Sequence, residues 1–279
     1  MEGQAYAAGT VINALATGIG CAFGLDLRTK VTISFEEDLR ENVVYENGEQ
    51  TENPIVDRVM ASFGEKGVVR IESEIPRGSG LGSSSAFMNA LLTALFKATH
   101  QELDAFRILT SNARLSLEMG ISYTGAFDDA SASLLGGFAV SNNTKMRLLK
   151  WEKIEGDAIV LIPPWKRGEV SLERIRENTK LVEMAVNEAI NGNYRLAMIY
   201  NSKHYCRVLG YAYEPIEKAE KLNVSAGLSG NGPTYVAFGS RDEIKELENI
   251  WSEYGEIIRT KLVTEPAENV TVPEHLFID

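Results

Sequence analysis

The chain has 279 residues, of which 44% are hydrophobic and 24% charged, a composition typical of globular proteins and not of disordered or fibrous ones. Its formal net charge of −11 disfavours nucleic acids and anionic membranes as partners, because most of the surface would repel them. Two distant cysteines and three scattered histidines provide no disulfide framework, zinc site or histidine triad, and the lack of a basic leader or long apolar run predicts a cytoplasmic protein.

The N-terminal half begins with clear strand and helix signals. Apolar and polar residues alternate over residues 25–35, which is the period of a half-buried strand. Asn53 can cap a helix that starts with Pro54 and ends at Gly64. A second strand is expected over residues 69–75.

Three further elements follow residue 76. A run of glycine and serine leads into a helix expected over residues 88–100. A second helix over about residues 104–119 leads into the loop ISYTGAFDDAS. A pair of glycines then turns the chain into a short strand at 138–140.

A buried strand at 158–162 is followed by two prolines, and the boundary between an N-terminal lobe (1–162) and a C-terminal lobe (163–279) is placed there. Helices and strands mix without strict βαβ repetition, which favours an α+β fold. The C-terminal lobe is expected to begin with a long helix over 172–190 and two shorter helical stretches before residue 223. Two strands joined by a glycine turn are expected over 224–240. A helix over 242–254 and a strand over 257–263 are expected to follow.

The run GSGLGSSS at residues 78–85 is the strongest chemical signal in the chain. Alternating glycines let backbone N–H groups converge, and a helix N-terminus behind them favours a bound phosphate. Serine hydroxyls there can cap the helix or ligate Mg²⁺. No GK[ST] is present and Ser85 replaces the last glycine of a dinucleotide fingerprint, so the two familiar phosphate loops are rejected. A surface turn with a serine cap is the alternative.

Two adjacent acids, Asp128 and Asp129, lie in a predicted loop after Glu118. Phosphoryl transfer to an alcohol needs a carboxylate near the acceptor hydroxyl and an acid or hydroxyl on Mg²⁺. Adjacent carboxylates cannot face the same way on an extended backbone, so one is expected to serve the site while the other caps a helix. Two solvated caps are the alternative. A third run, GLSGNGPT at 227–234, would let a ligand approach the backbone closely, or would be a long hairpin turn.

In this order and at these distances, the three runs resemble the motifs of the GHMP kinase superfamily. PRGSGLGSSSA resembles its phosphate loop, GAFDDASASLLGG its catalytic aspartate segment and GLSGNGPT its C-terminal glycine motif. The stretch MEGQAYAAGTVINALATGIGCAFGLDL is similar to the archaeal shikimate kinase family, so the resemblance covers essentially the whole chain. It implies a two-lobed α+β fold, with an N-terminal lobe like ribosomal protein S5 domain 2, a ferredoxin-like C-terminal lobe, and ATP between them.

The resemblance also implies roles for individual residues. Mg²⁺ would be held by Ser84 and Glu118. Asp128 would orient or deprotonate the acceptor hydroxyl, although the spacing in mevalonate kinases would choose Asp129. The residues implied to bind ATP are Pro76, Gly78, Ser79, Gly80, Leu81, Gly82, Ser83, Ser84, Ser85 and Asn53.

The chain departs from the family near its N-terminus. Several members carry PGKV with a lysine that assists catalysis, whereas AAGTV places Thr10 there. Thr10 and Asn13, with Asp128 and Gly230, are therefore expected at the acceptor site. A carboxylate on the acceptor would need a cation, and the residues that qualify by type are Arg28, Lys30, Lys166, Arg167 and Arg207.

The implied activity is phosphorylation of a small anionic metabolite, shikimate, by ATP with Mg²⁺. Homoserine kinase or another metabolite kinase of the superfamily is the alternative within the class. A ligand sensor that binds ATP without turnover is the alternative from another class, and retention of both Glu118 and Asp128 argues against it. The sequence does not indicate the oligomeric state.

Overall fold

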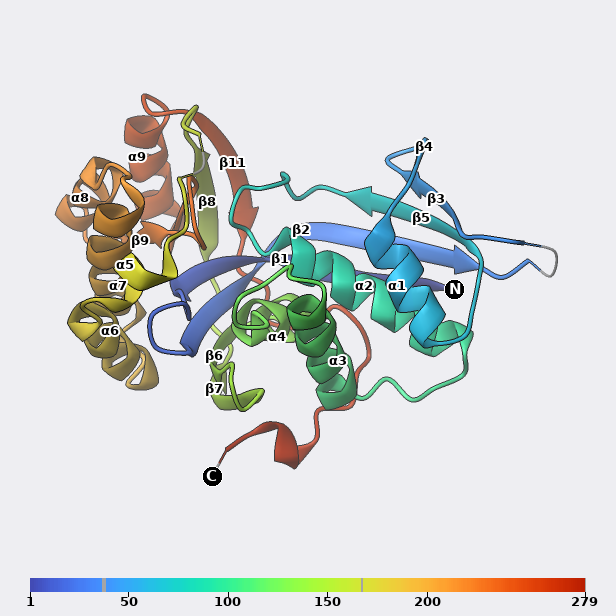
Figure 1. Cartoon of the computed structure of the whole chain (residues 1–279). Coiled ribbons are helices and arrows are strands. Elements are labelled where there is room, and N and C mark those ends of the chain that lie inside the picture. The colour runs from blue at the N-terminus through green and yellow to red at the C-terminus, as the bar shows by residue number, and fades with distance from the viewer. Residues whose placement is uncertain (37–38, 167, 279) are drawn as a thin grey trace.

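The computed structural model describes residues 1–36, 39–166 and 168–278, which form two sheets with helices packed against each (Figure 1). The strands of the first sheet are β1 (Glu2–Ile12), β2 (Ile19–Ser34), β3 (Val43–Glu46), β4 (Glu49–Thr51), β5 (Val68–Ser73), β6 (Phe138–Asn142) and β7 (Arg147–Glu152). Their order is β4-β3-β5-β2-β6-β7, and β1 pairs with β2.

The second sheet has four strands in the order β11-β8-β10-β9. These strands are β8 (Asp157–Ile162), β9 (Ser225–Leu228), β10 (Tyr235–Gly239) and β11 (Glu256–Lys261). Because β8 pairs with both β10 and β11, residues 157–162 belong to this sheet. A division of the chain into lobes after residue 162 stays a prediction.

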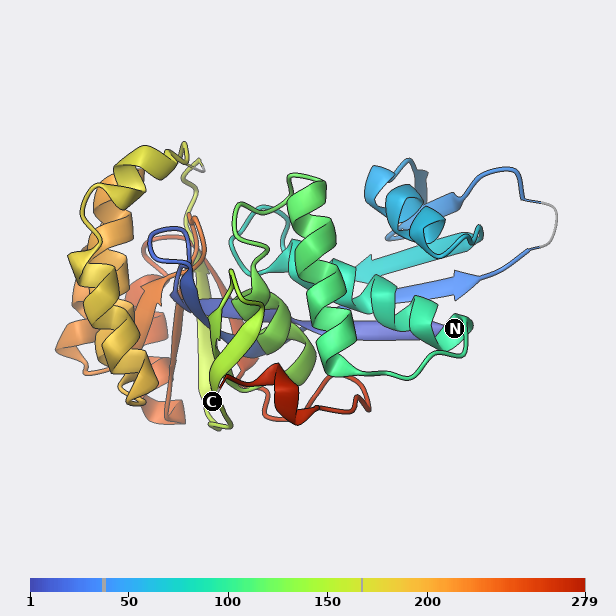
Figure 2. The ribbon, with the colours of Figure 1, turned by 60° about the horizontal axis from the view of Figure 1, so that its bottom comes forward.

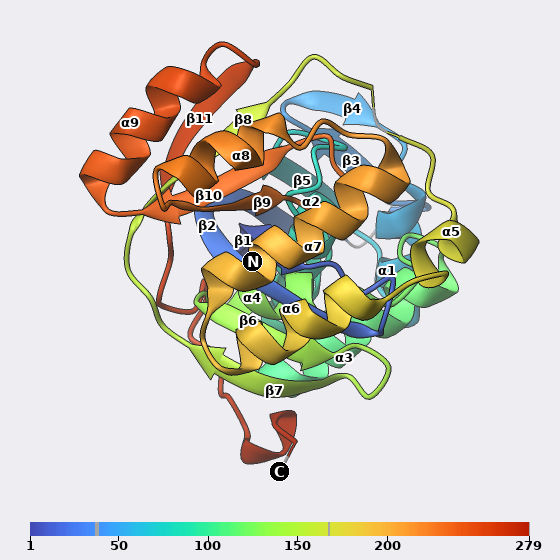
Figure 3. The same cartoon turned by 90° about the vertical axis from the view of Figure 1, so that its left-hand side faces the viewer.

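The helices fall into two groups (Figure 2). The first group is α1 (Pro54–Ser62), α2 (Ser83–Ala98), α3 (Ala105–Glu118) and α4 (Phe127–Leu135), of which α2 and α4 pack against β1 and β2. The second group is α5 (Leu172–Arg176), α6 (Lys180–Ile190), α7 (Tyr194–Leu209), α8 (Glu214–Lys221) and α9 (Arg241–Trp251). Helices α7 and α8 pack against β9, and in the end-on view of Figure 3 they lie in front of the second sheet. No helix in the described ranges has both the length and the apolar character that crossing a membrane requires.

The hairpin of β1 and β2 runs through both halves of the molecule. The two strands pair antiparallel from Glu2 opposite Thr32 to Ile12 opposite Cys21. Near the turn of the hairpin, the rings of Phe23, Phe138 and Phe238 pack together with centroids 5.1 Å apart in each pair; Phe23 stacks on Phe138, and Phe238 meets both edge to face. These rings come from both sheets, so a single apolar core joins the two halves.

After β11 the chain returns to the first sheet as a C-terminal strap, defined here as residues 262–278. Val263 N–H donates to Gly24 O at 3.1 Å, and Ala267 N–H donates to Leu134 O at 2.9 Å. A short 3₁₀ helix at Glu274–Leu276 lies near its end. The strap thus connects residues of the second sheet's last strand to β2 and α4.

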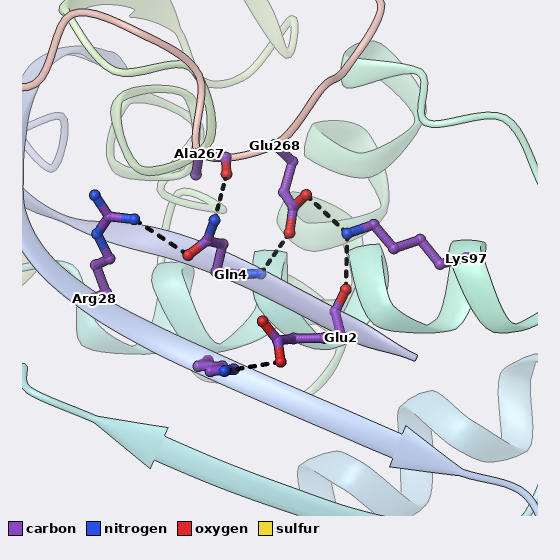
Figure 4. Close-up of polar contacts among 7 residues, drawn as sticks. Glu2, Gln4, Arg28, Lys97, Ala267 and Glu268 are labelled. Atoms are coloured by element: carbon purple, nitrogen blue, oxygen red, sulfur yellow. Dashed lines mark hydrogen bonds and ion pairs between the residues drawn. The ribbon is translucent and has the colours of Figure 1, made fainter.

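Glu268 fixes the strap to β1 and α2, as Figure 4 shows. Its carboxylate accepts a hydrogen bond from Gln4 N–H at 3.0 Å and another from Lys97 Nζ at 2.8 Å. The Gln4 amide donates to Ala267 O at 2.9 Å. The Glu268 side chain is 11% exposed, so its charge is largely removed from water and is compensated by these donors.

Most elements predicted from periodicity are confirmed. The strand expected at 25–35 is part of β2, and the helices expected after Asn53 and over 104–119 are α1 and α3. The strand, glycine turn and strand expected over 224–240 are β9 and β10.

Three predictions of local structure are wrong. The acids expected in a loop lie in the first turn of α4. The long helix expected over 172–190 is interrupted between α5 and α6, where the Asn178 side chain accepts from Lys180 N–H and offers the backbone an alternative to a continuous helix. Of the two stretches expected to be shorter, α7 has 16 residues against 11 in α6.

Candidate active site

A cavity of about 600 Å³ opens where the glycine–serine loop, the start of α4, the end of β1 and the turn after β9 meet. These segments are far apart in sequence, and the fold brings them to one place. The predicted site residues that line it are Thr10, Asn13, Gly78, Gly80, Gly82, Ser83, Ser84, Ser85, Asp128, Asp129 and Gly230.

The glycine–serine loop is held in shape by bonds to its neighbours. Leu81 O accepts from Ala8 N–H of β1 at 2.9 Å, and the Ser79 hydroxyl donates to Pro76 O at 2.7 Å. Gly80 has a φ of +86°, and a Cβ there would lie 2.4 Å from Ser229 O. Only glycine fits this position. Pro76, Ser79 and Leu81, which do not line the cavity, therefore shape the loop.

Helix α2 starts directly behind this loop. Its N-cap residue is Gly82, which has no side chain to satisfy the first N–H groups. The residues of the first turn, Ser83 to Ser85, line the cavity, and the Ser84 side chain is exposed there. Free N–H groups and the positive end of the helix dipole favour a bound anion such as phosphate.

Asp128 and Asp129 diverge from the start of α4. Asp128 is 4% exposed and accepts a hydrogen bond from the Asn143 amide at 2.8 Å. It lies against Gly20, where a Cβ would come within 2.2 Å of Asp128 Oδ2. Asp129 is half-buried on the side of the glycine loop, and a Cβ on Gly82 would lie 3.6 Å from its Cβ.

Burial raises the pKa of both carboxyl groups, and the negative charge of Asp128 raises the pKa of Asp129 further. The hydrogen bond from Asn143 opposes the rise in the pKa of Asp128. Among the described residues that line the cavity there is no lysine, arginine or histidine. The buried Asp128 and the half-buried Asp129, with serine and threonine hydroxyls nearby, form an oxygen-only donor set, which fits Mg²⁺.

Thr10 and Asn13 lie beside Gly230 and bind its backbone. Gly230 N–H donates to Thr10 Oγ1 at 2.8 Å, and Asn13 Nδ2 donates to Gly230 O at 2.9 Å. Thr10 is 2% and Asn13 8% exposed, so these side chains fix the end of β1 to the turn. Direct contact between either residue and an acceptor stays a prediction.

Besides Pro76, Ser79 and Leu81, two predicted site residues, Asn53 and Glu118, do not line the cavity. Asn53 caps α1 and accepts from Ile55 N–H and Val56 N–H at 3.1 and 3.3 Å. Glu118 is exposed at the end of α3, where its carboxylate lies 3.6 Å from Arg58 NH2. The face of α3 that reaches the cavity carries Ser116 instead.

The predicted cations are also placed elsewhere. Arg28 pairs with Asp26 at 3.2 Å and Lys30 with Glu2 at 2.8 Å. Lys166 and Arg207 are exposed, and neither lines the cavity. The prediction for Arg167 lies outside the described residues.

Several lining or supporting residues were not predicted. Asn143, which bonds Asp128, follows β6 in a turn whose sequence indicates only a turn. Asn231, Tyr123 and Glu169 also line the cavity, and the neighbours of Tyr123 and Glu169 carry no pattern that would separate them from other loop residues. Only Asn231 lies inside a motif, the run GLSGNGPT, and its neighbourhood alone could have identified it.

Known proteins resemble this chain in sequence and in structure. The family model "GHMP kinases N terminal domain" matches residues 44–137. A shikimate kinase of Archaeoglobus fulgidus is 50% identical over 277 residues, covering 99% of this chain and 98% of the relative. A shikimate kinase of Methanocella arvoryzae is 38% identical over 277 residues, covering 95% of each chain.

Solved structures share the fold at low identity. Mevalonate kinase from Methanococcus jannaschii superposes with a TM-score of 0.73 at 14% identity, covering 94% of this chain and 98% of that one. A putative homoserine kinase from Listeria monocytogenes gives a TM-score of 0.69 at 17% identity, covering 95% and 97%. These likenesses confirm the α+β fold predicted from the sequence motifs.

Proposed function

The chain belongs to the shikimate kinase family within the GHMP kinases, and from this premise we propose that it transfers the γ-phosphoryl group of ATP to shikimate, giving shikimate 3-phosphate and ADP. The observation that carries the proposal is 50% identity over nearly the whole length of a shikimate kinase. A cavity that joins an anion-binding loop to two acids is consistent with phosphoryl transfer to an alcohol.

The glycine–serine loop and the start of α2 would bind the phosphates of ATP. N–H groups of Ser83 to Ser85 have no partner from the cap residue, so they can donate to phosphate oxygens. These donors would be fixed before ATP binds, because bonds to β1 and to the turn after β9 hold the loop.

Asp128 would accept a hydrogen bond from the acceptor hydroxyl and orient its oxygen toward the γ-phosphorus. Its hydrogen bond with Asn143 and its contact with Gly20 support this role, since they fix the carboxylate in one orientation. Burial raises the pKa of Asp128 and so makes the carboxylate a better proton acceptor than an exposed one.

Asp129 and Ser84 would hold Mg²⁺ beside the phosphates, since Asp129 lies toward Gly82 and Ser84 is exposed in the cavity. When bound, Mg²⁺ would neutralise charge on the phosphate oxygens. Glu118, which was predicted as a ligand, is not included because its carboxylate lies beside Arg58.

The test is ADP release by the purified protein with ATP, Mg²⁺ and, separately, shikimate, homoserine and mevalonate. We expect ADP release with shikimate and none with homoserine or mevalonate. Turnover with homoserine and none with shikimate would assign the chain to another activity of the same superfamily. Tight ATP binding with no turnover of any of the three alcohols would support a sensor.

A further inference from the structure

The cavity lacks a partner for one group of the proposed acceptor. Shikimate carries a carboxylate, whereas the charged residues that line the described part of the cavity are Asp128, Asp129 and Glu169, all acidic. An uncompensated carboxylate beside these acids would be repelled, so a cation has to reach it from the rim.

Arg176 is placed at that rim. Glu169 and Val170 line the cavity immediately before α5, and Arg176 is the last residue of this helix. Its Nε donates to Leu15 O at 3.0 Å, and Leu15 also lines the cavity. The interruption between α5 and α6 ends the helix at this residue.

The guanidinium group of Arg176 has unused donors. Within the described residues it forms no ion pair, and its only hydrogen bond is the one through Nε. Two terminal nitrogens, NH1 and NH2, are therefore left to bind a carboxylate side by side, which is the geometry that arginine provides and lysine does not.

The loop that Arg176 bonds is also held by the buried hydroxyl of Tyr205. Tyr205 OH donates to Asn13 O at 2.9 Å and accepts from Ala16 N–H at 3.0 Å, so it supports the loop between β1 and β2. Burial raises the pKa of Tyr205, the Asp128 charge adds to the rise, and the Arg176 charge opposes it. Arg176 and Tyr205 therefore both bond to the loop of residues 13–16, which lies between β1 and β2.

We propose that Arg176 binds the carboxylate of the acceptor and so selects carboxylate-bearing alcohols at this site. The inference rests on the proposed function, because it assumes that shikimate is the acceptor. The Nε bond to Leu15 O would hold the guanidinium plane in place while NH1 and NH2 bind the substrate.

The test compares Arg176→Ala with Arg174→Ala. Arg174 is an exposed arginine of the same helix, and its replacement removes an equal charge. Loss of a bidentate ion pair should raise the KM for shikimate about 10- to 100-fold in Arg176→Ala and leave the KM for ATP within about 2-fold. Arg174→Ala should keep the KM for shikimate of the parent enzyme. Arg176→Lys should have a KM for shikimate between those of the parent enzyme and Arg176→Ala.

The methyl ester of shikimate separates binding of the carboxylate from support of the loop. If Arg176 binds the carboxylate, Arg176→Ala should raise the KM for shikimate, but it should leave the KM for the methyl ester nearly unchanged. An equal rise for acid and ester would overturn the inference in favour of a structural role through Leu15 O. The inference would also be overturned by an unchanged KM for shikimate in Arg176→Ala, or by an equal rise in that KM in the control Arg174→Ala. In each case the parent enzyme still phosphorylates shikimate, whereas failure of the parent to do so defeats the proposed function itself.

Discussion

The hydroxyl of Ser229 donates a hydrogen bond to the carbonyl of Gly80 at 2.8 Å, across 149 residues of sequence. The same oxygen accepts from Thr10 N–H at 3.1 Å. The phosphate loop, the end of β1 and the turn after β9 are therefore joined at one buried serine. Two motifs that the sequence analysis treated separately form one structural unit.

Gly80→Ala should abolish most activity, because the new methyl group would collide with Ser229 O and displace the loop. The matched control is Gly64→Ala. Gly64 has a similar φ of +71° against +86° for Gly80, but a Cβ there meets nothing within 4 Å. The control should lose about 1 to 2 kcal/mol of stability from backbone strain and keep its KM for ATP. Measurements are the free energy of unfolding in urea and the kinetics with ATP. Equal activity in the two variants would show that contact with Ser229 is unimportant.

Asp128→Asn should lower kcat by roughly 10² to 10⁴, or about 3 to 5.5 kcal/mol of barrier, while ATP affinity stays nearly unchanged. The substitution keeps the shape of the side chain but removes the charge. Single-turnover rates and equilibrium ATP binding separate the two effects. If Asp129→Asn lost turnover with saturating Mg²⁺ and Asp128→Asn did not, the roles of these acids would be reversed.

Ser84→Ala should shift the Mg²⁺ dependence of activity to higher concentration, with partial recovery at high Mg²⁺, because a hydroxyl ligand is lost. Glu118→Ala serves as the comparison. Since the Glu118 carboxylate lies beside Arg58 and outside the cavity, its removal should leave the Mg²⁺ dependence within about 2-fold. A large shift in Glu118→Ala would restore the role predicted from sequence.

Glu268→Ala should destabilise the protein by about 1 to 3 kcal/mol, because it leaves Gln4 N–H and the Lys97 ammonium without their acceptor. Glu265→Ala is the control on the same strap. The Glu265 side chain is 74% exposed and pairs with Lys153 at the surface, so its loss should cost less than about 1 kcal/mol. Urea unfolding of both variants measures the difference, and equal values would contradict the importance attached to the buried acid.

Of the two long strands that form the hairpin, β2 could be predicted in part from its sequence and β1 could not. The alternation from Leu25 to Phe35 identified only the later part of β2, where Asp26, Arg28 and Ser34 are exposed among more buried residues of the strand. Strand β1 shows no such alternation, since nearly all of its residues from Ala5 onward are buried. Its small residues gave no signal until the packing of α2 against them was known.

Site residues that lie in local sequence motifs could be predicted. Residues whose place at the site depends on the orientation of a helix in the fold could not. The glycine–serine loop and the two acids came from sequence because glycine, serine and paired acids have few roles in such runs. Glu118 and Arg176 show the limit. The rotation of α3 turns Glu118 toward Arg58, and the end of α5 brings Arg176 to Leu15, and neither orientation is encoded in the neighbouring residues.

The C-terminal strap has a consequence for biosynthesis. Among the described strands β1 pairs only with β2, and its residue Gln4 acquires its partners from Ala267 and Glu268. Gln4 precedes Ala267 by 263 residues and Glu268 by 264, so these partners are made long after it. During synthesis this edge of β1 therefore stays without its partners until residues 267 and 268 have left the ribosome.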